Sequence, residues 1–190
     1  MSAKKSLNTS FPFRIMKVSR IKEGRLSNAT KSEVRLIQMT PFFSDKVAMQ
    51  KRMKENPKIY EVHEAKREGL SFAVTTIFPG KIGREFFMTR GHAHRNPDPE
   101  IYHVLSGKGL LLCEDESFQH ALLEKGCVAY VPGFVRHRTV NVGTHPFIFL
   151  TTYATDAGHD YGYVETHGFS KIVVTRRGGW RVEQRVGKKI

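Results

Sequence analysis

The sequence predicts an all-β domain, built as a sandwich or jelly roll. From residue 59 onward, short strand-like segments follow one another at 59–64, 71–78, 84–89, 100–106, 109–113, 118–123, 127–131, 137–142, 147–153, 169–175 and 180–184. Turn signals separate many of them: Pro79-Gly80, Pro97-Asp98-Pro99, Gly107-Lys108-Gly109, Pro132-Gly133, Gly143 and Gly178-Gly179. Many short strands at this spacing are typical of sandwiches and jelly rolls. The length of 190 residues suits one domain with a sizeable core and is short for two.

The N-terminal part is expected to differ from the rest. We expect residues 1–57 to form a basic arm and a helix, and residues 58–190 to form the β domain, within a single structural domain overall. Residues 1–11 have the composition of an arm, and residues 13–18 alternate loosely, as an edge strand does. Residues 33–39 suggest a second strand with apolar side chains on both faces.

The best helix candidate covers residues 44–56. Ser44 is the expected N-cap, Asp45 suits the first turn, and Pro57 ends the segment. The apolar stripe of this helix is thin and consists of Val47, Met49 and Met53.

The formal net charge of +13 is concentrated toward the ends of the chain. Residues 1–55 carry 13 basic and 4 acidic side chains, and residues 171–190 carry 7 and 1. The middle, residues 56–170, carries 11 basic and 13 acidic side chains. No nucleic-acid-binding motif accompanies the basic ends, so we expect no dedicated nucleic-acid partner. We expect a solvated basic surface that attracts small anionic substrates.

Membrane and secretory signals are absent from the sequence. No stretch approaches the roughly 18 apolar residues of a membrane span. The basic N-terminus has neither the apolar core nor the cleavage site of a signal peptide, so we expect a cytoplasmic protein without a membrane partner. Cys113 and Cys127 lie in apolar strand-like runs outside any CxxC pattern, and we expect them to be reduced core thiols.

Three histidines and one carboxylate have the spacing of metal ligands. His92 and His94 are two residues apart, and side chains at this spacing on a strand point to the same face. Glu100 can return to that face on the next strand, and His137 can supply a third imidazole from another strand. Such a set suits a divalent first-row metal and leaves open coordination positions, as catalytic metals require. The alternative for an isolated histidine pair is a structural or exposed role.

Glycine and proline residues around these ligands add a second pattern. Gly107 and Gly109 follow Glu100 after a short strand-like run, and a later block contains Gly126, Pro132, His137 and Asn141. This arrangement resembles the two-motif signature of the cupin superfamily. The resemblance implies an all-β cupin double-stranded β-helix (jelly roll), here with an N-terminal extension that contains a short helix.

Four segments also resemble the cupin-type glucose-6-phosphate isomerases of archaea and some bacteria. They are Thr75 through Pro79-Gly80, Glu85 and Thr89 to Gly91-His92-Ala93-His94; Glu100-Ile101-Tyr102 with Gly107-Lys108-Gly109; His137-Arg138-Thr139-Val140-Asn141; and Ala157-Gly158-His159-Asp160-Tyr161-Gly162. Together they cover residues 59–175 approximately. The first and last segments extend beyond the general cupin signature and are therefore the more specific.

This resemblance implies a role for individual residues. The implied metal ligands are His92, His94, Glu100 and His137. The implied phosphate pocket consists of Thr75, Thr89, the backbone at Gly91, and Tyr153. The residues implied around the sugar chain are Tyr102, His159 and Tyr161, which complete the catalytic set with Glu100. From the residues alone, the threonines and tyrosines would be assigned as ordinary strand or loop residues.

The implied activity is the interconversion of glucose 6-phosphate and fructose 6-phosphate, a step of glycolysis and gluconeogenesis. We expect a homodimer that uses a divalent metal, with Fe²⁺ expected and Mn²⁺, Co²⁺, Ni²⁺ or Zn²⁺ as alternatives. In an enediol route, Glu100 is the candidate base that moves a proton from C2 to C1. The metal would offset charge on the substrate oxygens. A metal-assisted hydride shift is the alternative route, and the sequence does not choose between them.

Two other functions fit part of the pattern. A cupin dioxygenase would use the same ligand set with iron and oxygen, and its oxygen consumption would identify it. A non-catalytic sugar-sensing cupin domain would bind sugar without turnover. The dioxygenase is disfavoured by the segment 157–162. The sensor is disfavoured because the ligand set is complete and no recognisable DNA-binding segment is present.

Overall fold

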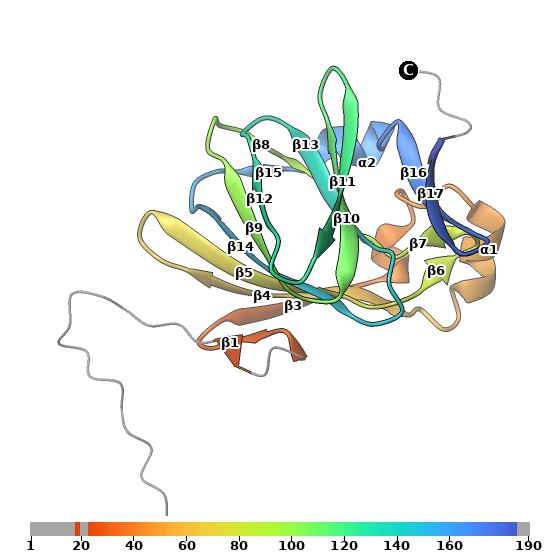
Figure 1. The fold of residues 1–190 in the computed structure, drawn as a ribbon, viewed down its shortest axis with the longest axis horizontal. Helices are drawn as coiled ribbons and strands as arrows, with labels where there is room; N and C mark the ends of the chain where they lie inside the picture. The colour runs from red at the N-terminus through yellow and green to blue at the C-terminus, as the bar shows by residue number, and fades with distance from the viewer. Residues whose placement is uncertain (1–17, 20–22, 186–190) are drawn as a thin grey trace, which may run out of the picture.

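The chain folds into two layers of antiparallel strands, shown in Figure 1 for the computed structural model, which describes residues 18–19 and 23–185. The predicted all-β class is confirmed. The longer strands are β3 (Thr30–Arg35), β4 (Lys58–Lys66), β5 (Leu70–Ile77), β9 (Glu100–Ser106), β10 (Lys108–Glu114), β11 (Phe118–Glu124), β12 (Val128–Val131), β13 (Arg136–Asn141), β14 (Phe147–Ala154), β16 (Lys171–Arg176) and β17 (Gly179–Gln184). The two-residue strands are β1 (Val18–Ser19), β2 (Arg25–Leu26), β6 (Lys81–Ile82), β7 (Glu85–Phe86), β8 (Ala93–His94) and β15 (His159–Asp160).

The first layer is a six-stranded sheet with the order β12-β9-β14-β5-β4-β3. Neighbouring strands in it are antiparallel, although several are far apart in the chain. In Figure 1, β3, β4 and β5 of this sheet curve beneath the strands of the other layer. The non-consecutive order is that of a jelly roll, in which strands cross between the two layers.

The second layer is assembled from smaller pieces. It contains a three-stranded sheet, β11-β10-β13, and a four-stranded sheet, β17-β16-β7-β6. Two isolated bridges, Met88 with Val140 and His92 with His137, connect β13 to the segment between β7 and β8. The side chains between the layers form the core, which includes Ile77, Leu110 and Phe147 at 0% exposure.

The predicted strand ranges agree closely with the observed ones from residue 58 to 184. The main exception is the predicted strand 84–89, of which only Glu85–Phe86 forms a strand, because the following residues leave the ladder to approach β13. The predicted strand 33–39 is also partly wrong. Strand β3 ends at Arg35, and Leu36–Met39 form the 3₁₀ helix η2, which buries Leu36 and Met39. The predicted edge strand at 13–18 lies outside the described residues except for Val18. The predicted arm at 1–11 lies wholly outside them.

The predicted helix exists but is shorter than expected. Helix α1 covers Lys46–Arg52, and its N-cap is Asp45, whose carboxylate accepts from the backbone N–H of Ala48 at 2.8 Å. Ser44 is therefore not the cap; its backbone N–H donates to Glu85 Oε1 at 2.6 Å. Met49 is buried as expected, but Val47 is 66% exposed. A second short helix, α2 (Gly162–His167), was not predicted.

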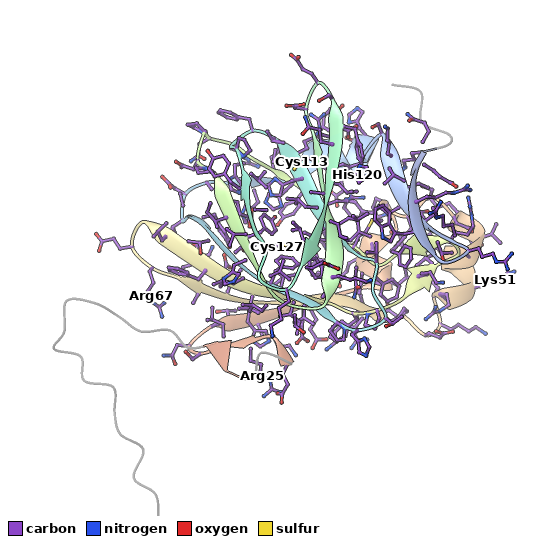
Figure 2. All side chains as sticks on the ribbon, in the orientation of Figure 1. Arg25, Lys51, Arg67, Cys113, His120 and Cys127 are labelled. Atoms are coloured by element: carbon purple, nitrogen blue, oxygen red, sulfur yellow. The ribbon has the colours of Figure 1, made fainter. Side chains whose placement is uncertain are left out.

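Several charged side chains point outward from the domain, and the two cysteine thiols are partly buried. In Figure 2, Arg25, Lys51 and Arg67 project away from the body of the domain. Cys113 and Cys127 are free and half-buried, which agrees with the expectation of reduced thiols. Among the described helices, none has the length and apolar character needed to cross a membrane.

Asn141 closes the end of β13 with three hydrogen bonds. Its fully buried amide donates to the carbonyls of Ile77 and His145, both at 2.9 Å. Its Oδ1 accepts from the backbone N–H of Gly143, also at 2.9 Å. The asparagine of the second cupin-like block therefore ties three chain segments together beside His137.

We expect Asn141→Ala to lower the free energy of unfolding by about 2–4 kcal/mol, because each buried polar group left without a partner costs about 1–3 kcal/mol. Urea titration followed by tryptophan fluorescence and circular dichroism measures the change. The matched control is Gln119→Ala, an exposed strand position, where the change should stay within about 0.5 kcal/mol. Equal stabilities for the two variants would contradict the structural role given to Asn141.

Candidate metal centre and substrate pocket

Three imidazoles and one carboxylate meet between the two layers. One ligand atom from each of His92, His94, Glu100 and His137 lies within 4.8 Å of the others. His94 ends β8, Glu100 begins β9 and His137 lies on β13, so three separate strands supply the group. The backbones of His92 and His137 form a bridge, with N–H to carbonyl distances of 3.1 and 2.8 Å.

Backbone carbonyls orient two of the imidazole rings. His94 Nδ1 lies 2.7 Å from the carbonyl of Asp98, and His137 Nδ1 lies 2.9 Å from the carbonyl of Val135. A carbonyl oxygen can only accept, so Nδ1 is the donor in each contact and Nε2 is the ring nitrogen that faces the cluster. Metal-binding histidines are commonly held in this tautomer by such contacts.

Glu100 is the centre of this group and is almost completely buried. Its Oε2 lies 3.0 Å from Nε2 of His137, 3.5 Å from that of His94 and 3.6 Å from that of His92. Burial alone would raise the pKa of Glu100, but the three imidazoles beside its carboxylate, His137 above all, outweigh burial and hold that pKa well below its usual range. Burial lowers the pKa of His92 to about 3, so this ring is neutral.

The donor set fits a metal ion. Nε2 of His92 and Nε2 of His94 are buried and have no hydrogen-bond partner among the described residues. Buried polar atoms without partners are rare, and two of them facing one carboxylate are satisfied together by a cation. Imidazole and carboxylate ligands suit divalent iron, manganese, cobalt, nickel and zinc.

A cavity of about 350 Å³ opens beside the cluster. It is lined by His92, Glu100 and His137, and by all seven of the other predicted site residues: Thr75, Thr89, Gly91, Tyr102, Tyr153, His159 and Tyr161. His94 belongs to the cluster but does not line the cavity. The volume lies within the range of small-molecule pockets.

Aromatic rings surround the cluster on the pocket side. His159 pairs with His94 across β15 and β8, and its ring centroid lies 4.2 Å from that of His92 and 4.9 Å from that of Tyr153. The Tyr161 ring lies 5.4 Å from His92 and is partly exposed. Tyr102 is buried with its ring 5.9 Å from His137, and burial together with the charge of Glu100 raises the pKa of its hydroxyl.

The predicted phosphate residues all line the cavity and come from different segments of the chain. Thr75, on β5, is paired with Phe149 of β14. Thr89 lies beside β13, where its hydroxyl accepts from the backbone N–H of Thr139 at 3.1 Å. Gly91 has a positive φ of 79°, and a Cβ there would lie 3.0 Å from the carbonyl of His137, so only glycine fits this close approach.

Several residues of the cavity lining were not predicted, among them Tyr60, Glu64 and Arg90. The hydroxyl of Tyr153 donates to Glu64 Oε1 at 2.5 Å. The alternation of β4 places Tyr60 and Glu64 on the same face, so the predicted strand 59–64 contained a signal for both. Arg90 lies between the predicted residues Thr89 and Gly91 in the sequence.

Comparison with known proteins gives a consistent family assignment. A family model described as glucose-6-phosphate isomerase (GPI) matches residues 33–190. Glucose-6-phosphate isomerase of Thermococcus litoralis is 46% identical over 163 residues, which are 82% of this chain and 86% of that protein. The enzyme of Pyrococcus furiosus is 45% identical over 167 residues, 84% and 88% of the two chains. A putative glucose-6-phosphate isomerase 1 of Rhizobium meliloti is 34% identical over 173 residues, 85% and 81% of the two chains.

Among solved structures, oxalate decarboxylase of Bacillus subtilis matches with a TM-score of 0.46 at 24% identity, over 53% of this chain and 27% of that chain. The family model and the curated relatives extend over the strands that carry the metal cluster and the cavity. The chain therefore belongs to the glucose-6-phosphate isomerase family.

Proposed function

We propose that this isomerase is metal-dependent and that its metal is held by His92, His94, Glu100 and His137. The observation that carries the proposal is the buried cluster itself, whose ligand atoms lie within 4.8 Å of one another at the wall of the cavity. When bound, a divalent cation would bind substrate oxygens there and offset negative charge that develops on them. Iron as the native metal, a homodimeric assembly and a cytoplasmic location stay predictions from the sequence.

We propose that the other lining residues divide between the two ends of the substrate. Thr75, Thr89 and the backbone N–H of Gly91 provide donors for the phosphate group, and Tyr153 lies beside them. Tyr102, His159 and Tyr161 surround the sugar chain. Enclosure by these rings excludes water from the reacting carbons and fixes the position of the open-chain sugar.

Glu100 is the proposed base. Its carboxylate would remove the proton from C2 of the open-chain aldose while the C1 carbonyl oxygen gains a proton, giving an enediol. Return of a proton to C1, with loss of the proton on the C2 oxygen, then gives the ketose. The three imidazoles, which outweigh the effect of burial on its pKa, keep this carboxylate ionised and in a fixed position, as a general base requires.

Metal removal tests the proposed function. We expect dialysis against a chelator to abolish the conversion of fructose 6-phosphate, measured in an assay coupled to glucose 6-phosphate oxidation. Addition of Fe²⁺, Mn²⁺, Co²⁺ or Ni²⁺ should restore it, because this ligand set accepts each of these ions. Full activity in protein shown by elemental analysis to be free of metal would contradict the proposal.

A ligand variant and a matched control locate the ion. His137→Ala should lose both bound metal and activity while its circular dichroism spectrum stays unchanged. His103→Ala changes a histidine on β9 whose side chain is exposed and does not line the cavity. It should keep both metal and activity.

Thr89→Val should raise KM for fructose 6-phosphate more than roughly tenfold, since a hydrogen bond to a charged group contributes about 1.5–3 kcal/mol. Thr89 also accepts from Thr139, so the control is Thr89→Ser, which keeps the hydroxyl. Steady-state kinetics on the three proteins separates the two effects. An unchanged KM in the valine variant would remove Thr89 from the phosphate site.

Glu100→Gln keeps the shape of the side chain but removes its basicity. We expect bound metal to be weakened yet detectable, and turnover to fall by roughly 10²–10⁴, the usual contribution of a positioned base. Wild-type turnover in deuterated water should place deuterium in the product, because an enediol exposes the transferred proton to exchange. A deuterium-free product together with near-normal turnover of the fully metal-loaded glutamine variant would favour a hydride shift.

A further inference from the structure

The described wall of the cavity contains few basic side chains for an enzyme that binds a sugar phosphate. Three of its lining residues are carboxylates: Glu64, Glu100 and Glu33, the last of which is paired with Lys31 at 2.8 Å. Among the described lining residues, Arg90 is the only lysine or arginine. A phosphate monoester carries between one and two negative charges at neutral pH, so its entry needs a cation on the protein at the phosphate end.

The Arg90 side chain has no partner within the described part of the chain. Its Nε atom is buried without a hydrogen bond, and no acidic group lies within ion-pair distance of its guanidinium. The residue as a whole is half-buried. A partly desolvated guanidinium without an acceptor is unfavourable in the free protein, and a phosphate group would remove that penalty.

The backbone of residue 90 is held on both sides. Its carbonyl accepts from the guanidinium of Arg138, which is buried and packs over the Phe169 ring at 4.4 Å. The flanking residues Thr89 and His92 are bonded through their N–H groups to β13, at 3.0 and 3.1 Å. Arg90 therefore starts from a fixed backbone position at the cavity wall.

The guanidinium also lies near the tyrosines of the cavity. Burial raises the pKa of Tyr161, and the positive charge of Arg90 acts against that rise. The charge of Arg90 acts in the same direction on the pKa of Tyr60, which also lines the cavity. The charge of Arg90 therefore acts on two tyrosines of the cavity wall, Tyr60 and Tyr161.

We propose that Arg90 is the residue that binds the phosphate charge of the substrate and so distinguishes phosphorylated from unphosphorylated sugars. This assignment rests on the proposed function, because it assumes that the phosphate lies at the Thr89 side of the cavity. The planar guanidinium can donate two parallel hydrogen bonds to one phosphate, which the threonine hydroxyls cannot. Arg138 acts behind it as a positioning residue.

Kinetics of Arg90→Gln test the assignment. We expect KM for fructose 6-phosphate to rise about ten- to a hundredfold, the loss expected for one hydrogen bond between charged groups, while kcat changes less than about threefold. Inhibition by inorganic phosphate should weaken by a similar factor, and Arg90→Lys should recover part of both losses. The matched control is Arg95→Gln, which removes an exposed arginine from the same segment outside the cavity and should leave KM and inhibition unchanged.

Calorimetric titration of inorganic phosphate into each protein separates this proposal from the proposed function. Wild-type protein should bind phosphate, and Arg90→Gln should bind it at least tenfold more weakly, even in a preparation without turnover. Melting temperature and metal content of the variant should equal those of the wild type. Equal phosphate affinity and equal KM in an active Arg90→Gln enzyme would overturn the role of Arg90 and leave the isomerase assignment intact.

Discussion

Glu100 is an ionised carboxylate buried where three imidazole rings meet, and much of the structure serves to hold it there. A buried charge is tolerated only when its partners are fixed in place. The carbonyls of Asp98 and Val135 fix two rings, and the backbone bridge between His92 and His137 fixes their separation. The two Nε2 atoms left without hydrogen bonds show that the protein alone does not complete this group.

The jelly roll supplies this arrangement because it brings distant strands together between its layers. Glu100 and Tyr102 come from the six-stranded sheet, whereas His137 comes from the second layer. Asn141 and Gly91 tighten the junction, one by bonding three segments and the other by allowing close approach of the backbones. The two motif blocks of the sequence thus contain ligands together with the residues that allow the layers to meet at the ligands.

The sequence predicted the strands well because their alternation and their turn residues are local signals. It failed where tertiary packing decides the structure: the strand predicted at 84–89 gives way to the approach toward β13, and η2 forms where a strand was expected. The ligand set could be predicted because its spacing is short and its residue types are chemically distinctive. Tyr60, Glu64 and Arg90 could not, because arginine, tyrosine and glutamate are common on surfaces and only the fold turns them toward the cavity.

The contact between Tyr153 and Glu64 limits how the proposed phosphate end of the cavity can work. A tyrosine hydroxyl has one proton, and Tyr153 donates it to Glu64 at 2.5 Å. Tyr153 can therefore donate to a phosphate oxygen only if this bond breaks or Glu64 takes up a proton. Either change costs free energy. The stabilisation from the contacts of the bound phosphate must be larger than this cost. The negative charge of Glu64 repels a phosphate group, and neutral hydroxyl donors do not offset this repulsion. Arg90 is the positively charged donor that the described cavity wall contains.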